Sequence, residues 1–189
     1  MADYSAADLR KGLRVELDGV PYVITEFNFV KPGKGAAIYN CRLKSLLDGN
    51  TFTRGFRSND KIKKPDLEER VMRFSYQHGD DYVFIDEHYE EVHLGPDVLR
   101  EQRFFLFEDC EVRVLYHNGR PVDITLPTFV EKEIVETEPG VRGDTATNVL
   151  KAAKIAGGYS LQVPLFVNQG DIVRIDTRTG EYVDRVAKK

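Results

Sequence analysis

Short runs of alternating apolar and polar residues, separated by turn signals, dominate this chain. Alternation of this kind is typical of half-buried antiparallel strands, because successive side chains of a strand point to opposite faces. The runs occupy residues 13–17, 22–30, 38–44, 71–76, 82–85 and 112–116. Asp18-Gly19 and Asn118-Gly119 follow two of these runs and predict tight hairpin turns. The pattern predicts an all-β protein built from small barrels or sandwiches.

Helical signals are confined to two places. Gly95 is followed by Pro96, which favours a helix over residues 96–102 with the proline in its first turn. Residues 149–156 have high helix propensity and end at Gly157-Gly158, so a second short helix is expected there.

Charge divides the chain into three parts. Residues 1–64 carry a net charge of +5, residues 65–128 carry −9, and residues 129–189 are neutral. Each part has about 60 residues, enough for one five- or six-stranded barrel. We therefore predict domains at 1–64, 65–128 and 129–189. The basic first domain suggests a polyanionic partner at that end of the chain, and an imbalance on solvated surfaces is the alternative.

Composition narrows the protein class. The 189 residues are 41% hydrophobic and 31% charged, as in ordinary globular proteins. No apolar run approaches the roughly 18 residues of a membrane span, and the first residues do not begin a signal peptide. The two cysteines, Cys41 and Cys110, are far apart and outside any C-x-x-C pair. A cytoplasmic protein with both cysteines in packing roles, and without a membrane partner, is expected.

The segment 31–37, Lys-Pro-Gly-Lys-Gly-Ala-Ala, joins two of the predicted strands. Pro32 fixes its own φ, and Gly33 and Gly35 can adopt positive φ, so the segment is typical of a hairpin tip. Lys34 is predicted to project from this tip with little around it. Such a lysine can contact an anionic polymer or be modified by an enzyme. The alternative is a hairpin that carries an ordinary surface lysine.

The sequence does not have the residue spacing of the known enzymatic motifs that it partly resembles. A phosphate-binding P-loop needs glycine at position 28 and serine or threonine at position 35, where Asn28 and Gly35 stand. The acidic and histidine-rich run 86–93 has no known metal-site spacing, and no G-x-S-x-G sequence is present. We expect no catalytic residue, no metal and no cofactor.

Four segments, in order, resemble bacterial translation elongation factor P over the whole chain. They are the tip segment 29–36, the loop 143–148, a spaced signature (Lys151, Ala153, Gly158, Leu161, Val163, Pro164, Val167, Gly170) and the segment 176–186. Two positions depart from the family pattern. Ala152 stands where the family commonly has proline, and Asp184 where it often has serine.

The resemblance implies a fold and a function. The fold would be an SH3-like barrel followed by two OB-fold barrels, in an L-shaped, tRNA-like arrangement. The family binds both ribosomal subunits between the peptidyl and exit sites and relieves stalling at consecutive prolines, acting on the CCA end of peptidyl-tRNA. A monomeric, non-enzymatic translation factor is therefore expected. A general single-stranded nucleic-acid binder built on OB barrels is the alternative.

The resemblance also implies site residues. Lys34 would contact the CCA end and be the target of a modifying enzyme, within a tip loop that includes Lys31, Pro32, Gly33 and Gly35. Tyr182 and Arg185 would contact RNA, although Tyr182 could instead be a core tyrosine. Arg42 and Lys44 are candidate contacts to tRNA phosphates, and ordinary solvated charge is the alternative for each. A loop that would contact the small ribosomal subunit comprises Arg142, Gly143, Asp144 and Thr145, and a tight Asx-type turn is the alternative there.

Overall fold

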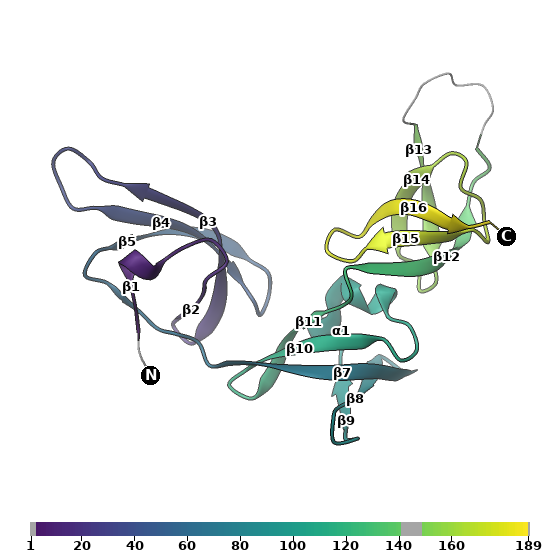
Figure 1. The fold of residues 1–189 in the computed structure, drawn as a ribbon, viewed down its shortest axis with the longest axis horizontal. Coiled ribbons are helices and arrows are strands. Elements are labelled where there is room, and N and C mark those ends of the chain that lie inside the picture. Colours follow the sequence, from purple (N-terminus) through teal and green to yellow (C-terminus); the bar gives the residue numbers. More distant parts are fainter. Residues whose placement is uncertain (1–2, 141–148, 189) are drawn as a thin grey trace. The chain divides into compact units, whose positions relative to one another are not determined.

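The computed structural model describes residues 3–140 and 149–188, and its sheets account for most of the chain (Figure 1). The prediction of an all-β protein is confirmed. The chain forms two compact units, one of residues 1–70 with 114–123 and one of residues 71–113 with 124–189. In the part of the chain that the structure describes, no helix is long and apolar enough to cross a membrane. The division into three domains at 1–64, 65–128 and 129–189 and the L-shaped arrangement stay predictions.

The first unit is built on a four-stranded antiparallel sheet in the order β2-β3-β4-β5. Its strands are β2 (Arg14–Leu17), β3 (Val20–Val30), β4 (Ile38–Ser45) and β5 (Thr51–Arg57). A two-stranded sheet of β1 (Tyr4–Ser5) and β6 (Lys61–Ile62) accompanies it, with a 3₁₀ turn at Ala6–Asp8. Alternate strand residues point inward, and Val15, Ile24, Cys41, Leu43 and Phe56 form the buried core.

Both predicted hairpin turns are present. Asp18 and Gly19 have φ of 51° and 78°, and Asn118 and Gly119 have φ of 50° and 77°. Positive φ at both central residues is the requirement of the type I′ turn, which matches the twist of the flanking strands. These two turns could be predicted because their chemistry is local.

Segment 114–123 completes the first unit through buried contacts. His117 and Glu16 are 6% and 5% exposed, and His117 Nε2 lies 3.0 Å from Glu16 Oε2. Lys63 Nζ lies 2.5 Å from the other carboxylate oxygen of Glu16. An apolar cluster of Leu46, Leu115 and Val122 packs on Val23 and Leu67.

A five-stranded sheet in the order β11-β10-β7-β8-β9 forms the middle of the chain. Its strands are β7 (Leu67–His78), β8 (Asp81–Ile85), β9 (Glu91–Leu94), β10 (Glu111–His117) and β11 (Arg120–Thr125). The helix predicted after Gly95 is confirmed as α1 (Pro96–Leu99), which continues into a 3₁₀ turn at Arg100–Phe105. The helix α1 lies against β9, the strand that precedes it.

The C-terminal sheet has the order β14-β13-β12-β15-β16. Its strands are β12 (Phe129–Thr137), β13 (Leu150–Ile155), β14 (Ser160–Pro164), β15 (Ile172–Asp176) and β16 (Glu181–Ala187). The helix predicted over residues 149–156 is wrong, because β13 pairs with both β12 and β14. Ala153 and Ile155 are buried while Lys154 between them is exposed. Sheet pairing and this alternation outweigh the helix propensity of alanine and lysine.

Within the second unit, the 3₁₀ turn packs on the C-terminal sheet. Gln102 Nε2 donates to the Thr177 carbonyl at 2.7 Å. The Tyr159 ring lies 5.0 Å from the Phe105 ring and 5.6 Å from the Phe104 ring, measured between centroids. Lys132 Nζ donates to the Leu106 carbonyl, and burial lowers the pKa of this lysine. These contacts join residues 100–106 to the C-terminal sheet within the second unit.

Candidate functional site

The predicted hairpin tip joins β3 to β4. The last cross-strand pairs are Phe29 with Tyr39 and Val30 with Ile38, and residues 31–37 form the loop between them. Gly35 has φ of 134°, a conformation that other residues rarely adopt, and an added Cβ there would lie 3.5 Å from Pro32 Cγ. Gly33 does not use the positive φ that the sequence allowed for it. The loop therefore depends on glycine at one of the two predicted positions.

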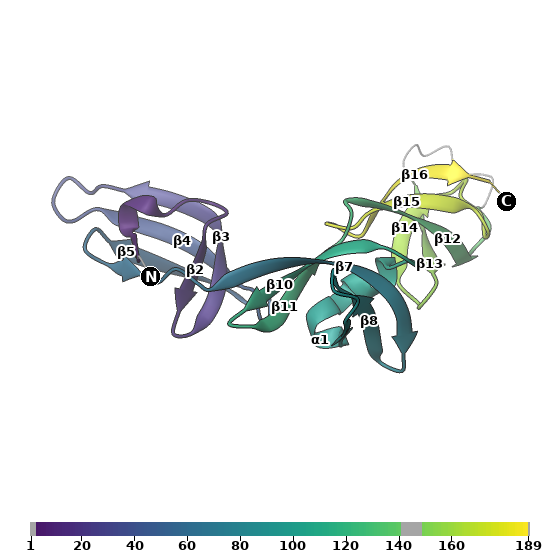
Figure 2. The same ribbon diagram turned by 60° about the horizontal axis from the view of Figure 1, so that its bottom comes forward.

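Lys34 lies at the tip of this loop and is exposed, as are Lys31, Pro32, Gly33 and Gly35. Neither Lys34 nor Lys31 has a side-chain hydrogen bond or ion pair with any other residue that the structure describes. Both Figures 1 and 2 show the β3–β4 hairpin extending beyond the rest of its sheet. A cation in this position is free to meet a ligand without first giving up an internal partner.

Aromatic side chains stiffen the hairpin below its tip. The Phe29 and Tyr39 rings are 4.9 Å apart, and the Phe27 and Tyr39 rings are 6.3 Å apart, measured between centroids. Cross-strand aromatic pairs each contribute about 0.2–1 kcal/mol to sheet stability. Because these rings lie on the face that continues into the buried Cys41, they connect the tip to the core of the first unit.

Arg42 and Lys44 share the opposite, solvent-facing side of β4. They alternate with the buried residues Cys41, Leu43 and Ser45, as the period of two requires. Arg42 Nη1 lies 3.1 Å from Glu26 Oε1 on β3, and both side chains are at least half exposed. An exposed pair of this kind is worth about 0–1 kcal/mol, so it leaves Arg42 able to exchange its partner for a phosphate.

The C-terminal candidates have different surroundings. Arg185 Nη1 donates to the Phe166 carbonyl at 3.1 Å and lies 3.2 Å from Asp171 Oδ2. Its guanidinium also lies 4.7 Å from the centroid of the Phe166 ring, and only 19% of the side chain is exposed. Arg185 therefore ties β16 to the loop between β14 and β15. Asp184 pairs instead with Arg174, at 3.2 Å, because adjacent strand residues face opposite ways.

Tyr182 is half-buried and lines a hollow of about 410 Å³ with Tyr159 and Gln162. Burial raises the pKa of the Tyr182 hydroxyl. Tyr182 is thus neither a fully buried core residue nor a fully exposed one, and its role stays a prediction. The predicted small-subunit loop, Arg142, Gly143, Asp144 and Thr145, lies outside the described residues.

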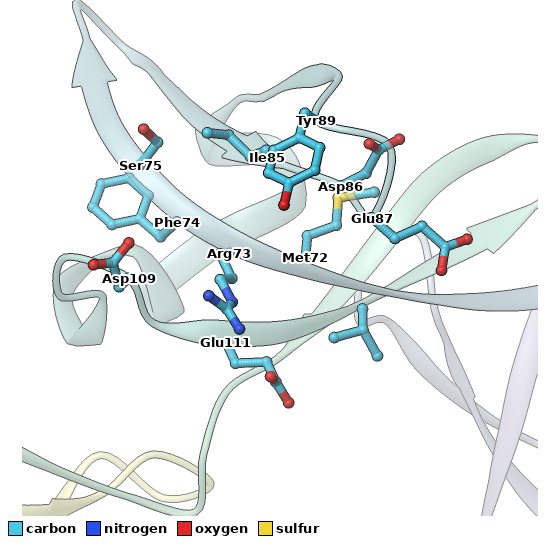
Figure 3. Close-up of a pocket in the computed structure, with 11 residues that line it drawn as sticks. Met72, Arg73, Phe74, Ser75, Ile85, Asp86, Glu87, Tyr89, Asp109 and Glu111 are labelled. Carbon is cyan, nitrogen blue, oxygen red and sulfur yellow. The ribbon is translucent and has the colours of Figure 1, made fainter.

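A hollow of about 480 Å³ on the middle sheet has the opposite charge to the tip. Arg73 lies in it among four carboxylates, as Figure 3 shows. The carboxylates belong to Asp86, Glu87, Asp109 and Glu111. Within residues 3–140 and 149–188, no group of three or more acidic, histidine or cysteine side chains is arranged to hold a metal ion. The acidic rim repels phosphate, so this hollow is not suited to bind a nucleic-acid backbone.

A second hollow, in the first unit, was missed by sequence reasoning. It measures about 490 Å³, and Arg10, Lys11, Arg14 and Lys64 line it. The available signals were two basic pairs, each followed by a turn-forming residue, at 10–12 and 63–65. Neither pair indicates on its own that the two segments come together.

Comparison with known proteins gives concordant results along the whole chain. Family models described as the elongation factor P KOW-like domain, the elongation factor P OB domain and the elongation factor P C-terminal domain match residues 5–62, 67–124 and 130–185. The chain is 46% identical over 183 residues to elongation factor P of Desulfotalea psychrophila, covering 96% of this chain and 98% of that protein. It is 48% identical over 183 residues to elongation factor P of Coprothermobacter proteolyticus, with the same coverage.

Solved structures agree on the fold. Eukaryotic translation initiation factor 5A from Methanococcus jannaschii aligns with a TM-score of 0.56 at 24% identity, over 66% of this chain and 92% of that chain. A translation initiation factor eif-5a family protein from Naegleria fowleri aligns with a TM-score of 0.52 at 19% identity, over 66% and 97%. At these identities the likeness concerns the fold alone.

Proposed function

We propose a function on the premise that the chain belongs to the elongation factor P family of translation factors. In this proposal the protein binds the ribosome between the peptidyl and exit sites and promotes peptide-bond formation at consecutive prolines. The observation that carries the proposal is Lys34, which is exposed at the end of a stiffened hairpin and has no partner among the described residues. Its target would be the CCA end of peptidyl-tRNA. The cytoplasm, where ribosomes translate, would be its compartment.

The chemistry that this requires is positioning. Proline is a slow partner in peptide-bond formation because its ring fixes φ and restricts both the nascent chain and the attacking amine. A factor that holds the peptidyl-tRNA end in a reactive pose can lower the barrier by several kcal/mol without supplying an acid, a base or a nucleophile. We therefore propose a non-enzymatic role. Lys34 would place a cation on the CCA backbone, and an enzymatically attached extension would lengthen its reach.

Further contacts would orient the factor. Arg42 and Lys44 lie on one face of β4, where they could meet tRNA phosphates, which position a protein without reading sequence. We retain residues 142–145 as the proposed contact with the small subunit. Tyr182 and Arg185 would act mainly by holding the C-terminal barrel in shape, since both are engaged within it.

The test is synthesis through a triple-proline reporter in a purified translation system. The protein is isolated from its own source cells so that any extension on Lys34 is retained, and the mass of the tip peptide records whether one is present. Lys34→Ala is compared with Lys61→Ala, which removes an exposed lysine from β6 of the same unit. We expect rescue by the native protein and by Lys61→Ala, and loss of rescue in Lys34→Ala. Equal rescue by both variants would contradict the role of Lys34.

The same translation system distinguishes the proposed translation factor from the alternative, a general single-stranded nucleic-acid binder. Such a protein would bind bare oligonucleotides through a continuous basic groove and would not rescue the reporter selectively. The acidic hollow on the middle sheet is unfavourable to nucleic-acid binding in that part of the chain. Failure of the native protein to rescue, with normal synthesis of a proline-free reporter, would refute the proposed function.

A further inference from the structure

The first unit contains a positively charged hollow that is separate from the hairpin tip. We call it the basic hollow, and its lining residues are Tyr4, Arg10, Lys11, Gly12, Leu13, Arg14, Lys64, Pro65 and Leu67. They come from β1, from the loop before β2 and the start of β2, and from the segment between β6 and β7 with the start of β7, whereas the tip lies between β3 and β4. Four of the lining residues are cationic and none is acidic.

Three of these four cations are available to a ligand. Arg14 Nη1 lies 3.5 Å from Glu69 Oε1 and is partly neutralised. Arg10, Lys11 and Lys64 are exposed, and their side chains form no hydrogen bond or ion pair with the residues that the structure describes. The carboxylate of Asp8, the nearest acidic neighbour of Arg10 in sequence, accepts hydrogen bonds from the Ser5 backbone N–H and hydroxyl, which lower its pKa, and the charge of Arg10 adds a smaller lowering without an ion pair.

The neighbouring lysines of the second basic pair have different roles. Lys63 is used internally, since its Nζ lies 2.5 Å from the buried carboxylate of Glu16. Lys64 is the next residue and lines the basic hollow. The buried Pro65 and the half-buried Leu67 follow it and anchor this edge of the hollow. The chain therefore neutralises one lysine of the pair and leaves the other without an ion-pair partner among the residues that the structure describes.

The other edge of the hollow is a fixed turn. Gly12 has φ of 87°, and its N–H donates to the Ile24 carbonyl at 2.7 Å. Leu13 N–H donates to the Arg10 carbonyl at 3.1 Å, which closes the turn that bears Arg10 and Lys11. A Cβ on Gly12 would have no heavy atom within 4 Å, so a ligand can approach the backbone closely here. Tyr4 is held by the pairing of β1 with β6.

We propose that the basic hollow is a binding site for a backbone phosphate of an RNA strand. Uncompensated lysine and arginine side chains around a turn are the groups that neutralise RNA phosphates. The half-buried Tyr4, which packs on the core of the first unit, also lines the hollow, where the exposed part of its ring would contact the adjoining ribose or base. The volume of about 490 Å³ lies in the range of ligand sites and exceeds the needs of a lone phosphate, which favours a nucleotide unit within a chain.

This inference deepens the proposed function and rests on it for the source of the RNA, which would be the transfer or ribosomal RNA beside the bound factor. It adds a second RNA contact to the one made by the tip. Because the two sites use different residues, each can be removed while the other is kept.

The experiment measures RNA binding by the full-length chain outside the ribosome. The probe is a fluorescein-labelled RNA duplex of roughly 12 base pairs, followed by anisotropy between about 50 and 200 mM KCl. Arg10→Ala/Lys11→Ala is compared with Arg120→Ala/Lys61→Ala, which removes the same two charges from the first unit outside the hollow. The hollow variant is expected to lose about fivefold or more in affinity, and its plot of log K against log salt should become shallower by about one for each lost contact.

Amide chemical shifts of the native protein locate the contact. Addition of the duplex is expected to move the Gly12 and Leu13 amides, and the movement should be absent in the hollow variant. Equal losses of affinity in both double variants would overturn the proposal, because only net charge would then matter. Unchanged RNA binding combined with weaker ribosome binding would also overturn it, in favour of a ribosomal protein as the partner of the hollow.

The two proposals fail in different ways. Lys34→Ala should keep the shifts at Gly12 while losing rescue of the triple-proline reporter. Failure of that rescue in the native protein would refute the proposed function and leave the anisotropy result intact. Loss of RNA binding at the hollow with full rescue would locate the functional contact at the tip alone, and would overturn a role for the hollow on the ribosome.

Discussion

Replacement of Glu16 by glutamine should destabilise the first unit far more than the same change at an exposed ion pair. Glu16 is 5% exposed, and its carboxylate lies 3.0 Å from His117 Nε2 and 2.5 Å from Lys63 Nζ. Hydrogen bonds from Lys63 and then His117 hold the pKa of Glu16 below its ordinary value. The carboxylate is therefore ionised and can only accept, which places a proton on His117 Nε2.

The size of the expected loss in unfolding free energy follows from the burial of the Glu16 carboxylate. A hydrogen bond to a charged group contributes about 1.5–3 kcal/mol, and a buried group left unpaired costs about 1–3 kcal/mol. Glutamine keeps one acceptor but turns its amide nitrogen toward one of the two donors. We expect Glu16→Gln to lower the unfolding free energy of the first unit by about 2–3 kcal/mol. The matched control is Glu26→Gln, whose exposed pair with Arg42 predicts a loss of about 0–1 kcal/mol.

Native-state hydrogen exchange of β4 amides is the assay, because it reports opening of the first unit without contributions from the second. A carboxylate with a lowered folded pKa adds stability that is fully present above its unfolded pKa and is lost as pH falls through the folded value. The difference between native protein and Glu16→Gln should thus be constant from neutral pH down to about 5 and shrink below about 4. A loss in Glu16→Gln no larger than that in Glu26→Gln would refute this reasoning.

Two further predictions concern packing. Gly180→Ala should destabilise the second unit by clearly more than Gly19→Ala destabilises the first, as measured by hydrogen exchange. Both glycines have positive φ, so both substitutions introduce backbone strain. A Cβ at Gly180 would in addition overlap the Tyr159 hydroxyl, whereas a Cβ at Gly19 would have no heavy atom within 4 Å. Left-handed strain alone costs about 1 kcal/mol, and equal losses at the two sites would show that Tyr159 moves aside freely. Cys41 and Cys110 should resist iodoacetamide at pH 8 in the folded protein and react after unfolding in urea, because both are buried and burial raises the pKa of each thiol. Rapid labelling of folded protein, followed by mass spectrometry, would contradict this.

Features that depend on neighbouring residues could be predicted from the sequence. The turn at Asp18-Gly19 was predictable because both residues tolerate positive φ and alternating strands flank it. The exposure of Lys34 followed from the glycines beside it. In contrast, residues 150–155 form a strand despite their helix propensity, because β12 and β14 supply hydrogen-bonding partners that no local window contains.

Contacts between distant residues could not be predicted. Glu16 and His117 are 101 positions apart, and only the folded arrangement of β2 and β10 brings them together. The same limit applies to Arg185. Its sequence context indicates a cation near the C-terminus, while its bonds to Phe166 and Asp171 depend on the loop between β14 and β15. The basic hollow likewise requires two segments about 50 residues apart.

The discontinuous make-up of the first unit has a consequence for biosynthesis. The core strands of this unit end at Ile62, yet His117, Leu115 and Val122 complete its buried contacts. At a translation rate of about 5–20 residues per second, the segment that satisfies Glu16 emerges roughly 3–10 seconds after Lys63. During that interval the nascent barrel holds a carboxylate that lacks one of its two donors and an uncovered Leu46. The N-terminal barrel should therefore reach its full stability only after strands of the middle sheet have been synthesised. Its folding would then be completed together with that of the middle sheet and not before it.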